Sequence, residues 1–544
     1  VGDDRLAAEL DGAADGAGRV LFAPAADGSP FDAAAAYRLF NDAGRIATDL
    51  LAGPGQTPPR LFFLTRNAQS VLEGDRANPV QAVLWGLGRS LALEHPEIWG
   101  GVVDVDESMP AVLAARCLRR EANAGDGEDQ VAYRGGQRYV PRLRQAAPAE
   151  SKTEFSGAGS HLVVGATGHI GPHLIRQLAA MGAGTVVAVS RNPGDRLTAL
   201  RAELAATGTT LIEVAADVTD AAAMAGLFDR FGNDLPALEG IYLAAFAGGP
   251  VVLAEMTDGD VATMFGPKLD ALATLHELSL RTDVRHFVLF SSISGLLGSR
   301  WLAHYTATST FLDSFAHARR SLGLPATVVN WGLWKSLSDQ QTDAGEVMSN
   351  AGLEPMPDEV AIRTLALLLD PGAPVQTAVV DADWPLLTEA YRTRGALRIV
   401  DDIAAQHAGA GASTTESDFA RQLRECAPEH RRDLLAERVA AVASAVIGLP
   451  PGKALDPDAG FFQLGMDSLM SVKLQRRLGE TLGTSLPAAL IYEYPTVSAL
   501  TDALCERLGY PPADQPEGPA GSALGARARQ RALIRAGAQV SRRR

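Results

Sequence analysis

The chain has 544 residues, which exceeds what one core holds, and its 47% hydrophobic and 21% charged residues are typical of globular proteins. A net charge of −15 argues against a nucleic-acid partner. No apolar run reaches the ~18 residues of a membrane span, and no signal peptide is visible. The three cysteines are few and lie far apart, which predicts a cytoplasmic location and no metal site. Because the chain does not begin with Met, we expect a fragment of a longer protein.

Residues 1–145 alternate short apolar runs with helical patterns, which predicts a parallel sheet covered by helices. Strands are expected at 19–23, 61–64, 101–104 and 130–133, and helices at 31–51 and 79–93. No glycine-rich turn follows any of these strands, so we expect a Rossmann-like subdomain without a nucleotide site. Gly86 and Gly88 fall inside the second helical pattern, where close helix packing is the favoured explanation.

Residues 145–159 are rich in Ala, Ser and Gly and predict a linker. A second series of strands and helices fills residues 160–400 and predicts a doubly wound sheet of about seven strands. These strands are expected at 161–164, 185–189, 210–215, 240–245, 286–291, 326–330 and 375–380.

Three further segments follow the second sheet. Residues 401–417 are small and polar and predict a flexible linker, and residues 418–508 show helical patterns that predict a small all-α bundle. The tail, 509–544, ends rich in arginine and is interpreted as solvated, with a short helix docking onto a partner protein as the alternative. The expected fold is therefore α/β, with two Rossmann-like subdomains, the first degenerate and the second catalytic, followed by a helical bundle.

A glycine-rich turn follows the first strand of the second sheet and precedes a helix. Glycines let the backbone approach a pyrophosphate, and the helix start offers it free N–H groups. Tight turns without a ligand also use glycine, but the strand–turn–helix context favours a nucleotide site. The expected contacts are Gly165, Thr167, Gly168, His169, Ile170 and Gly171.

The next two strands end in residues suited to the rest of a dinucleotide. Ser190 and Arg191 close the second strand, where an arginine suits the 2′-phosphate of NADPH and an acidic residue would favour NAD. Asp217 and Val218 end the third strand, and Asp217 is expected either to bind the adenine amino group or to cap a helix beginning at Thr219. NADPH is the expected cofactor.

Ser292 closes an apolar strand pattern, and Tyr305 opens a helical one 13 residues later. Reduction of a ketone leaves negative charge on oxygen, so a group must donate a proton. Tyrosine, with a pKa near ~10, does so poorly unless a nearby ammonium lowers that pKa. We therefore predict Tyr305 as the proton donor, Lys268 as the ammonium and Ser292 as the hydroxyl that holds the carbonyl oxygen. Each residue alone also has a structural explanation: Tyr305 as a packed aromatic, Lys268 as a solvated charge and Ser292 as a helix cap.

At these positions the chain resembles the ketoreductase of modular type I polyketide synthases, within the short-chain dehydrogenase/reductase superfamily. The resemblance implies that residues 1–145 brace the catalytic half, and that 335–357, with Trp331, Leu333 and Trp334, forms a lid over the substrate. It rests on Trp85-Gly-Leu-Gly-Arg89, Leu93-Glu-His-Pro96, Pro267-Lys268-Leu-Asp270, Phe290-Ser-Ser292, Tyr305 with Phe311-Leu-Asp313, and Trp331-Gly-Leu333-Trp334.

Three departures from the family pattern stand out. Ser309 replaces an asparagine, and its hydroxyl is expected to relay a proton through water. In Ala244-Ala245-Phe246, a phenylalanine replaces a glycine near the nicotinamide and is expected to crowd it. The stereochemical markers leave the alcohol's configuration open, although the lack of the Leu-Asp-Asp marker favours the A-type.

The stretch Leu464-Gly-Met-Asp-Ser468-Leu469 precedes a strong helical pattern and resembles the attachment motif of an acyl carrier protein. The alternative is an ordinary helix cap. The resemblance implies that a phosphopantetheinyl transferase places 4′-phosphopantetheine on Ser468, and that the arm carries a β-ketoacyl chain to Tyr305. Tethering of this kind raises the effective substrate concentration.

The predicted function is NADPH-dependent reduction of a carrier-bound β-ketoacyl thioester. One alternative is a reductively inactive or epimerising domain joined to an active carrier, and another is a free-standing dehydrogenase of a diffusible ketone. The resemblance implies upstream ketosynthase and acyltransferase domains, with or without a dehydratase, and a homodimer. If the tail docks, its partner would be a downstream synthase subunit.

Overall fold

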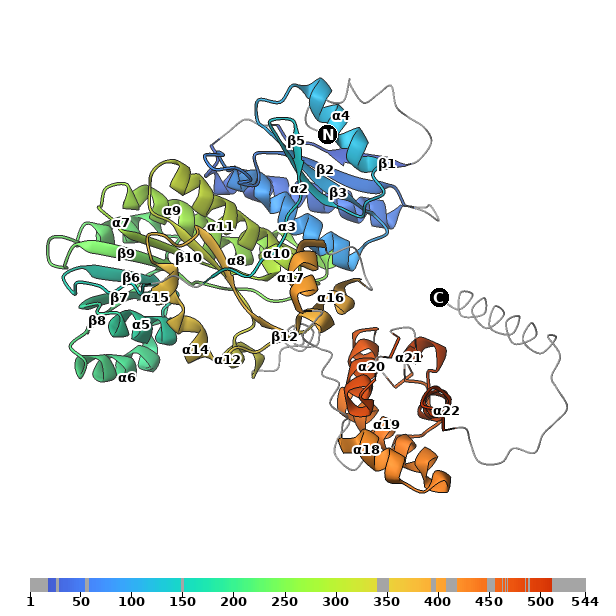
Figure 1. Cartoon of the computed structure of the whole chain (residues 1–544). Helices are drawn as coiled ribbons and strands as arrows, with labels where there is room; N and C mark the ends of the chain where they lie inside the picture. Colours follow the sequence, from blue (N-terminus) through green and yellow to red (C-terminus); the bar gives the residue numbers. More distant parts are fainter. Residues whose placement is uncertain are drawn as a thin grey trace. The chain divides into compact units, whose positions relative to one another are not determined.

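The computed structural model describes residues 18–25, 29–53, 58–147, 151–339, 352–392, 398–407, 418–447 and 455–510, apart from 462, 465, 467, 485, 488 and 489. The chain divides after Ser413 into two compact units, the first built on two sheets and the second helical (Figure 1). Among the described helices, none is long and apolar enough to cross a membrane. The predicted fold class is confirmed.

The first sheet has the order β1-β2-β3-β4-β5 and is parallel except for its last, antiparallel pair. On β2, Leu61 and Phe63 pack with α2 and α3, whereas Phe62 and Leu64 pack with α4 on the other face. The elements are β1 (Arg19–Phe22), α2 (Ala33–Ala52), β2 (Arg60–Arg66), α3 (Pro79–Glu94), β3 (Trp99–Val105), α4 (Ala111–Ala122), β4 (Gln130–Arg134) and β5 (Gln137–Tyr139). The four predicted strands and two predicted helices are present, and α4 and β5 were not predicted.

The second sheet has seven strands in the order β13-β11-β10-β9-β6-β7-β8, all parallel. Chain order reverses between β6 and β9, which in open α/β sheets is where ligands bind. The strands are β6 (Ser160–Val164), β7 (Thr185–Ser190), β8 (Thr210–Ala215), β9 (Leu238–Leu243), β10 (His286–Ser292), β11 (Thr327–Trp331) and β13 (Gln376–Val379). All seven lie where the sequence predicts them, within two residues at either end.

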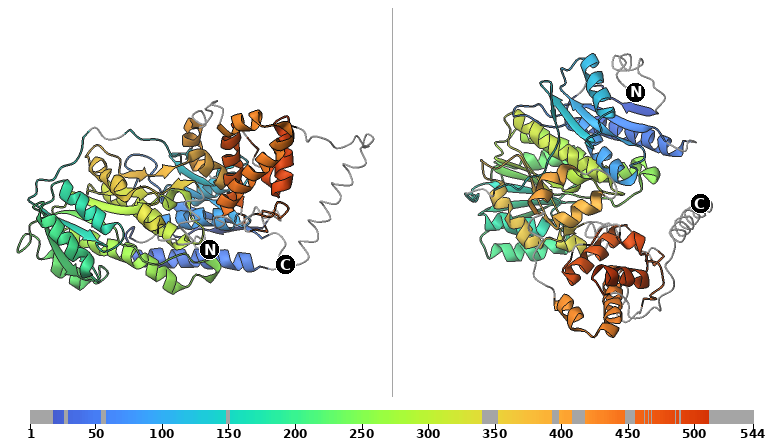
Figure 2. Two further views of the ribbon diagram at one scale, coloured as in Figure 1. Left: turned by 90° about the horizontal axis from the view of Figure 1, so that it is seen from below. Right: turned by 45° about the vertical axis from the view of Figure 1, so that its right-hand side comes forward.

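Helices cover both faces of this sheet. The longest, α11, packs along α3 of the first subdomain (Figure 2). The helices are α5 (Gly171–Ala180), α6 (Gly194–Ala205), α7 (Ala221–Phe228), α8 (Asp258–Phe265), the π-helical turn η3 (Gly266–Asp270), α9 (Ala271–Ser279), α10 (Ser294–Leu297), α11 (Ala303–Ser321), α12 (Lys335–Ser338), α14 (Asp358–Arg363), α15 (Leu365–Leu368), α16 (Trp384–Arg392) and α17 (Asp401–His407); η2 (Leu253–Glu255) and η4 (Arg398–Val400) are 3₁₀ turns, and a small ladder pairs β12 (Leu353–Glu354) with β14 (Asp381–Ala382).

Two glycines of α3 allow close packing. A Cβ on Gly86 would lie 2.5 Å from the Cα of Ala307 on α11, so only glycine lets the two helices approach this closely. A Cβ on Gly88 would collide with the ring of Trp99. The close helix packing predicted for Gly86 is confirmed, whereas Gly88 makes room for a side chain of strand β3.

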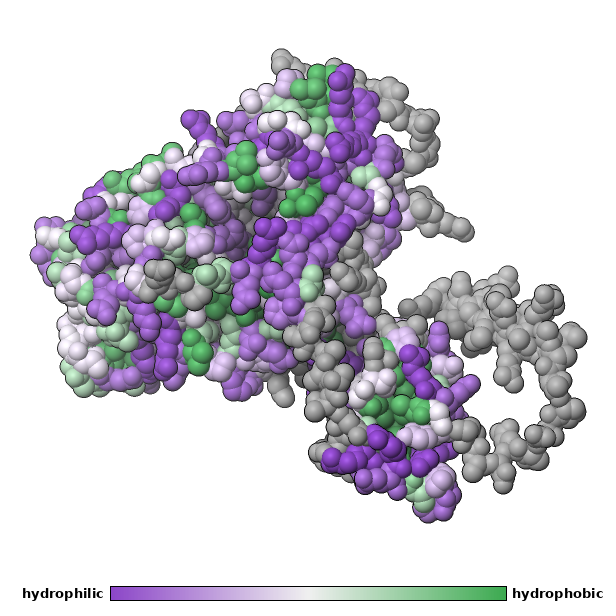
Figure 3. All heavy atoms as spheres, viewed as in Figure 1, coloured by the Kyte–Doolittle hydropathy of each residue, from purple (hydrophilic) through white to green (hydrophobic). Residues whose placement is uncertain are grey.

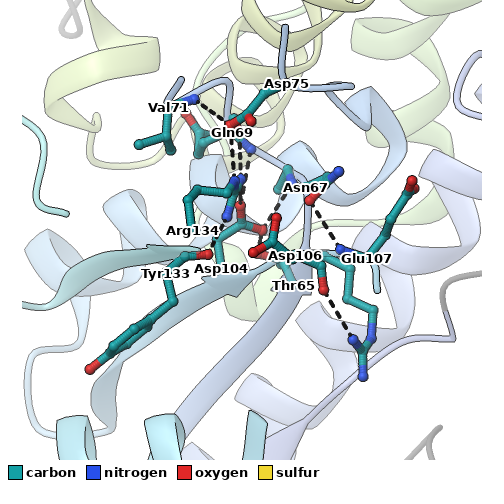
Figure 4. Close-up of polar contacts among 12 residues, drawn as sticks. Thr65, Asn67, Gln69, Val71, Asp75, Asp104, Asp106, Glu107, Tyr133 and Arg134 are labelled. Carbon is teal, nitrogen blue, oxygen red and sulfur yellow. Dashed lines mark hydrogen bonds and ion pairs between the residues drawn. The ribbon is translucent and has the colours of Figure 1, made fainter. Parts of the chain in front are cut away.

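The carboxyl ends of β2, β3 and β4 are filled by a buried polar cluster (Figure 4). Arg134 donates to Asp104 at 2.5 Å and to Asp75 at 2.9 Å. Asp104 also accepts from the hydroxyl of Thr65 at 2.6 Å and from the backbone of Ala68 at 2.9 Å. Arg134 and Asp104 are 1% and 0% exposed, so the protein's own ion pair fills the end of the sheet where a Rossmann fold would hold its nucleotide.

Two expected linkers are more structured than predicted. In the segment 145–159, the backbone of Phe155 donates to Met181 O at 2.7 Å, and its ring packs on His161. In the segment 401–417, α17 occupies the first seven residues, and its Ile403 is buried in a cluster with Trp384. The apolar contacts of Phe155 and Ile403 outweigh the small, polar composition around them. Residues 408–417 and the tail from 511 lie outside the described residues.

The second unit is a small bundle of helices, as predicted. Leu474 and Leu478 of α20, Ile491 of α21 and Leu500 of α22 form its core with Phe461, and all five are fully buried. In Figure 3, hydrophobic residues gather near the middle of the bundle's visible face, with hydrophilic residues around them. The helices are α18 (Asp418–Glu425), η5 (Pro428–His430), α19 (Arg431–Ile447), α20 (Ser468–Leu482), α21 (Leu490–Glu493) and α22 (Val497–Arg507).

Candidate functional site

The glycine-rich turn lies at the carboxyl end of β6, against the end of β9. Gly165 has φ +90°, and a Cβ there would lie 2.7 Å from Ala245 N, so both backbone conformation and space require glycine. A Cβ on Gly171 would collide with Ala166 O. The helix α5 begins at Gly171, and its N-cap residue Ile170 has no polar side chain, so no hydroxyl or carboxylate of that residue covers the helix start.

Polar groups line the neighbouring strand ends. The hydroxyls of Thr167 and Ser190 share a hydrogen bond of 2.7 Å, which joins the glycine turn to the end of β7. Arg196 donates to Thr167 O at 2.9 Å and fixes the turn from α6. Gly168 is exposed at its tip and His169 is half-buried beside it. Thr167 and Ser190, both predicted to contact the dinucleotide, therefore lie together.

Arg191 and Asp217 are both exposed at the ends of β7 and β8. The pKa of Asp217 is lowered by hydrogen bonds from the backbone and hydroxyl of Thr219 and by the nearby charge of Arg191. Of the two alternatives for Asp217, the cap on a helix beginning at Thr219 is wrong: α7 begins at Ala221, and Asp220 caps it. The side chain of Val218, expected beside the adenine, is buried and belongs to the hydrophobic core.

Ser292, Tyr305 and Lys268 meet at the carboxyl end of β10. Ser292 is the last residue of that strand and Tyr305 lies in the first turn of α11, where the Ser292 hydroxyl is close enough to favour the phenolate form of Tyr305. The Ser292 oxygen accepts from the backbone and the hydroxyl of Ser294, at 3.2 and 2.8 Å. Lys268 Nζ lies 5.7 Å from the centre of the Tyr305 ring and donates to Phe290 O at 3.2 Å. The structure thus brings together the three residues singled out in the sequence.

Burial dominates the electrostatics of this site. It lowers the pKa of Lys268 to about 8, against the opposing effect of the Asp313 carboxylate. It also raises the pKa of Tyr305, although the nearby Ser292 hydroxyl favours the phenolate. The lowered pKa expected for Tyr305 is therefore wrong for the protein alone, because loss of hydration outweighs the opposing effect of the Ser292 hydroxyl.

Asp313 anchors a buried network that sequence reasoning missed. Burial raises its pKa to about 6, and its two oxygens accept from Asn330 Nδ2 at 3.0 and 2.9 Å. Arg89 of α3 donates to the carbonyl of Gly295, three residues after Ser292, and to Gln130 at 2.8 Å. Both Asp313 and Arg89 lie in sequence motifs that carry the family resemblance. The sequence therefore marked these two residues, but it did not indicate what either one does.

The carrier motif lies at the start of a helix, as expected. Ser468 is the first residue of α20, and Ser471, one turn later, donates to the hydroxyl of Tyr492 at 3.2 Å. Tyr492 itself is 47% exposed on α21. This part of the bundle therefore presents a helix start and an exposed aromatic ring.

Known proteins share these features. The KR domain matches residues 159–336, the phosphopantetheine attachment site matches 437–504, and the Rossmann fold domain of the polyketide synthase extender module SpnB matches 1–143. A solved A-type ketoreductase from a modular polyketide synthase is 34% identical with a TM-score of 0.63, covering 68% of this chain and 78% of that one. The chain belongs to the modular polyketide synthases.

Two further relatives support the same family assignment. A phenolphthiocerol/phthiocerol polyketide synthase protein of Mycobacterium bovis is 62% identical over 495 residues, or 90% of this chain. The chain spans only 32% of the length of that mycobacterial protein. A solved A1-type ketoreductase is 30% identical with a TM-score of 0.61, covering 72% of this chain and 94% of the other.

Within this ketoreductase region, Ser309 and Phe246, two of the three departures from the family pattern, have different surroundings. Ser309 is fully buried and donates to Tyr305 O at 3.0 Å, so its hydroxyl is engaged by its own helix. Phe246 is 55% exposed, and its ring lies edge-on to that of Tyr305, with centroids 5.3 Å apart. Phe246 thus forms an exposed apolar wall beside the predicted proton donor.

The aromatic residues assigned to the lid lie in the core. Trp331 is 2% exposed and stacks on Phe290 with centroids 5.4 Å apart, and Trp334 is 3% exposed against Trp331. Leu333 is buried as well. Because these side chains pack inward, they anchor the start of the segment 335–357, and residues 340–351 of that segment lie outside the described residues.

Proposed function

We propose that this region of a polyketide synthase reduces a β-ketoacyl thioester, held on its own carrier bundle, to the β-hydroxyacyl thioester with NADPH. The observation that carries the proposal is the meeting of Ser292, Tyr305 and Lys268 at the end of β10. That site adjoins β9, whose own end packs against Gly165 of the glycine turn.

The residues at the switch point suit NADPH. The uncapped start of α5 and the exposed turn at Gly168 would hold the pyrophosphate, and the exposed guanidinium of Arg191 would hold the 2′-phosphate. Asp217, already engaged by Thr219, keeps an ionised carboxylate for the adenine amino group. When bound, NADPH supplies the hydride for the ketone carbon.

Ser292 and Tyr305 would act on the ketone oxygen. The Ser292 hydroxyl acts on the Tyr305 phenol, so both groups can reach one ketone oxygen: Ser292 orients the carbonyl and Tyr305 transfers its proton to the oxygen, which becomes the alcohol. Lys268, protonated below its pKa of about 8, stabilises the phenolate that remains. Phe246 keeps water from one edge of the Tyr305 ring.

The bundle would deliver the substrate. Ser468, at the start of α20, would carry 4′-phosphopantetheine, placed by a phosphopantetheinyl transferase. Ketosynthase and acyltransferase domains of the same synthase would build the chain, with the assembly acting as a homodimer. The absence of Leu-Asp-Asp and the likeness to two solved A-type enzymes support an A-type alcohol.

A second candidate, a reductively inactive or epimerising domain beside an active carrier, is favoured by Phe246, which occupies space beside Tyr305. NADPH oxidation with a diffusible β-ketoacyl thioester separates the two. We expect turnover by the wild type and a fall of at least ~100-fold in Tyr305→Phe, with NADPH binding retained. No NADPH oxidation by folded wild type would favour the second candidate, and full activity in Tyr305→Phe would remove the proton-donor assignment.

A further inference from the structure

One hydrogen bond joins the first subdomain to the helix that carries the catalytic lysine. Tyr37, on α2, donates its hydroxyl to Asp270 Oδ2 at 3.0 Å across 233 positions of sequence. Asp270 closes the π-helical turn η3, and Lys268 lies two residues earlier on that turn. The contact therefore reaches the lysine's own backbone segment from a subdomain that has no catalytic residue of its own.

The π-helical turn has a consequence for Lys268. Helices α8 and α9 continue into each other through η3, where one extra residue enters the turn. In this turn the ammonium of Lys268 reaches Phe290 O, next to Ser292 and beneath the Tyr305 ring. A wider turn has poorer backbone geometry than an α-helix, and π-turns occur mostly where function requires them.

The Tyr37 side chain is held firmly enough to act as a support. Its ring packs edge-on against Phe265 with centroids 4.9 Å apart, and Phe40 of the same helix packs against Phe265 at 5.3 Å. Phe265 is fully buried and directly precedes the π-turn. The ring contact fixes the tyrosine, and the hydroxyl then fixes the Asp270 carboxylate at the far end of the turn.

We infer that Tyr37 is a positioning residue for reduction: its hydrogen bond to Asp270 holds the π-helical turn, and thereby the ammonium of Lys268, in place beneath Tyr305. The inference rests on the proposed function, because it assigns a purpose to the lysine's position. It also gives the first subdomain a direct effect on the rate of reduction, beyond general bracing.

Tyr37→Phe tests this directly, because it keeps the ring and removes only the hydroxyl. Tyr133→Phe is the matched control: Tyr133 also donates to a carboxylate, that of Glu121, but the bond lies wholly within the first subdomain. We expect kcat to fall roughly tenfold in Tyr37→Phe, with the KM values for NADPH and thioester unchanged, since a misplaced group slows the chemical step. Tyr133→Phe should keep the wild-type kcat.

The partner residue supplies the rescue. Asp270→Asn keeps an oxygen that accepts from Tyr37 and should retain most of kcat, whereas Asp270→Ala should match Tyr37→Phe. The double variant Tyr37→Phe/Asp270→Ala should be no slower than either single variant, since both remove one bond. Additive losses, or equal losses in Tyr37→Phe and Tyr133→Phe, would overturn the inference.

A second readout does not depend on turnover. Hydrogen–deuterium exchange by mass spectrometry should show faster exchange of the backbone amides of Gly266, Lys268, Leu269 and Asp270 in Tyr37→Phe than in Tyr133→Phe. Unchanged exchange would contradict the inference. If wild type oxidised no NADPH, the proposed function would fail, while this measurement would still decide whether Tyr37 holds the turn.

Discussion

At the residue scale, burial sets the charge of Lys268. Because its pKa is lowered to about 8, the ammonium that stabilises the Tyr305 phenolate is present below that pH and lost above it. We predict that kcat is steady near neutrality and falls as pH rises through about 8, well before the usual lysine value. Measuring kcat and NADPH binding in parallel from about pH 6 to about pH 10 checks this. A kcat that stays level to the alkaline end would contradict it.

Ser309 also gives a residue-scale prediction. Its hydroxyl donates to Tyr305 O, so Ser309→Ala removes one helix-internal hydrogen bond and little else. We predict that kcat stays within about fivefold of wild type, which is the change that the ~1 kcal/mol of such a bond would cause if all of it were lost from the transition state. Steady-state kinetics with a diffusible thioester measures this. A drop beyond about tenfold would restore the proton relay expected from the sequence.

Site residues that could be predicted lie close to their partners in the sequence, whereas those that could not be predicted lie far from theirs. Ser292 and Tyr305 stand close in sequence, after a recognisable strand, so their joint role could be predicted. Tyr37 and Arg89 act on groups 233 and 206 positions away. No local pattern reports such pairs, because only the packing of α2 and α3 on the second subdomain creates them.

At the element scale, α3 and α11 approach closely because of one glycine. Gly86→Ala puts a Cβ into the backbone of α11, and we predict a loss of stability of about 1–3 kcal/mol or more. Gly44→Ala on α2 is the control, since its Cβ would have no atom within 4 Å and alanine favours a helix by about 0.5–1 kcal/mol. Thermal unfolding should show a lower Tm for Gly86→Ala and an equal or higher one for Gly44→Ala. Equal Tm values for the two variants would show that the helices are free to separate.

The elements also show what a hydrophobic pattern reports. Five strands of the second sheet, β6, β7, β9, β10 and β11, are mostly buried on both faces, so each appears as an apolar run that could be predicted. The two edge strands, β8 and β13, are only partly buried. The strand β5 is a short, polar edge strand without such a run. Its signal was the preceding pair Gly135-Gly136, whose φ values of +56° and +79° suit a tight hairpin. The π-turn η3 left no visible pattern, because one inserted residue barely alters a helical period.

At the scale of the whole molecule, the carrier's contribution can be isolated. If the substrate is delivered on Ser468, then Ser468→Ala should abolish reduction of carrier-bound chains and leave the kcat/KM for a diffusible thioester unchanged. The enzyme is loaded with a phosphopantetheinyl transferase, and product on the carrier is measured by mass spectrometry. Reduction of carrier-bound chains that survives in Ser468→Ala would place the attachment elsewhere.

The chain uses a Rossmann-like fold twice, the second time with a glycine-rich turn and the first time without one. The missing glycine turn predicted that the first would hold no nucleotide, but the sequence could not reveal what fills that end of its sheet. Arg134 and Asp104 lie 30 positions apart and meet only because β3 and β4 are neighbours. Removing one partner alone would leave a buried, unpaired charge, which makes the pair a unit of the fold.

The most direct test of the central claim is transfer of deuterium from NADPH deuterated at the reactive carbon to a β-ketoacyl chain on Ser468. We predict that the chain on the wild-type carrier gains one deuterium and one hydrogen, and that the gain disappears in Tyr305→Phe while NADPH still binds. A chain that emerges unreduced from folded, loaded wild type, or one reduced equally well without the Tyr305 hydroxyl, would contradict the account.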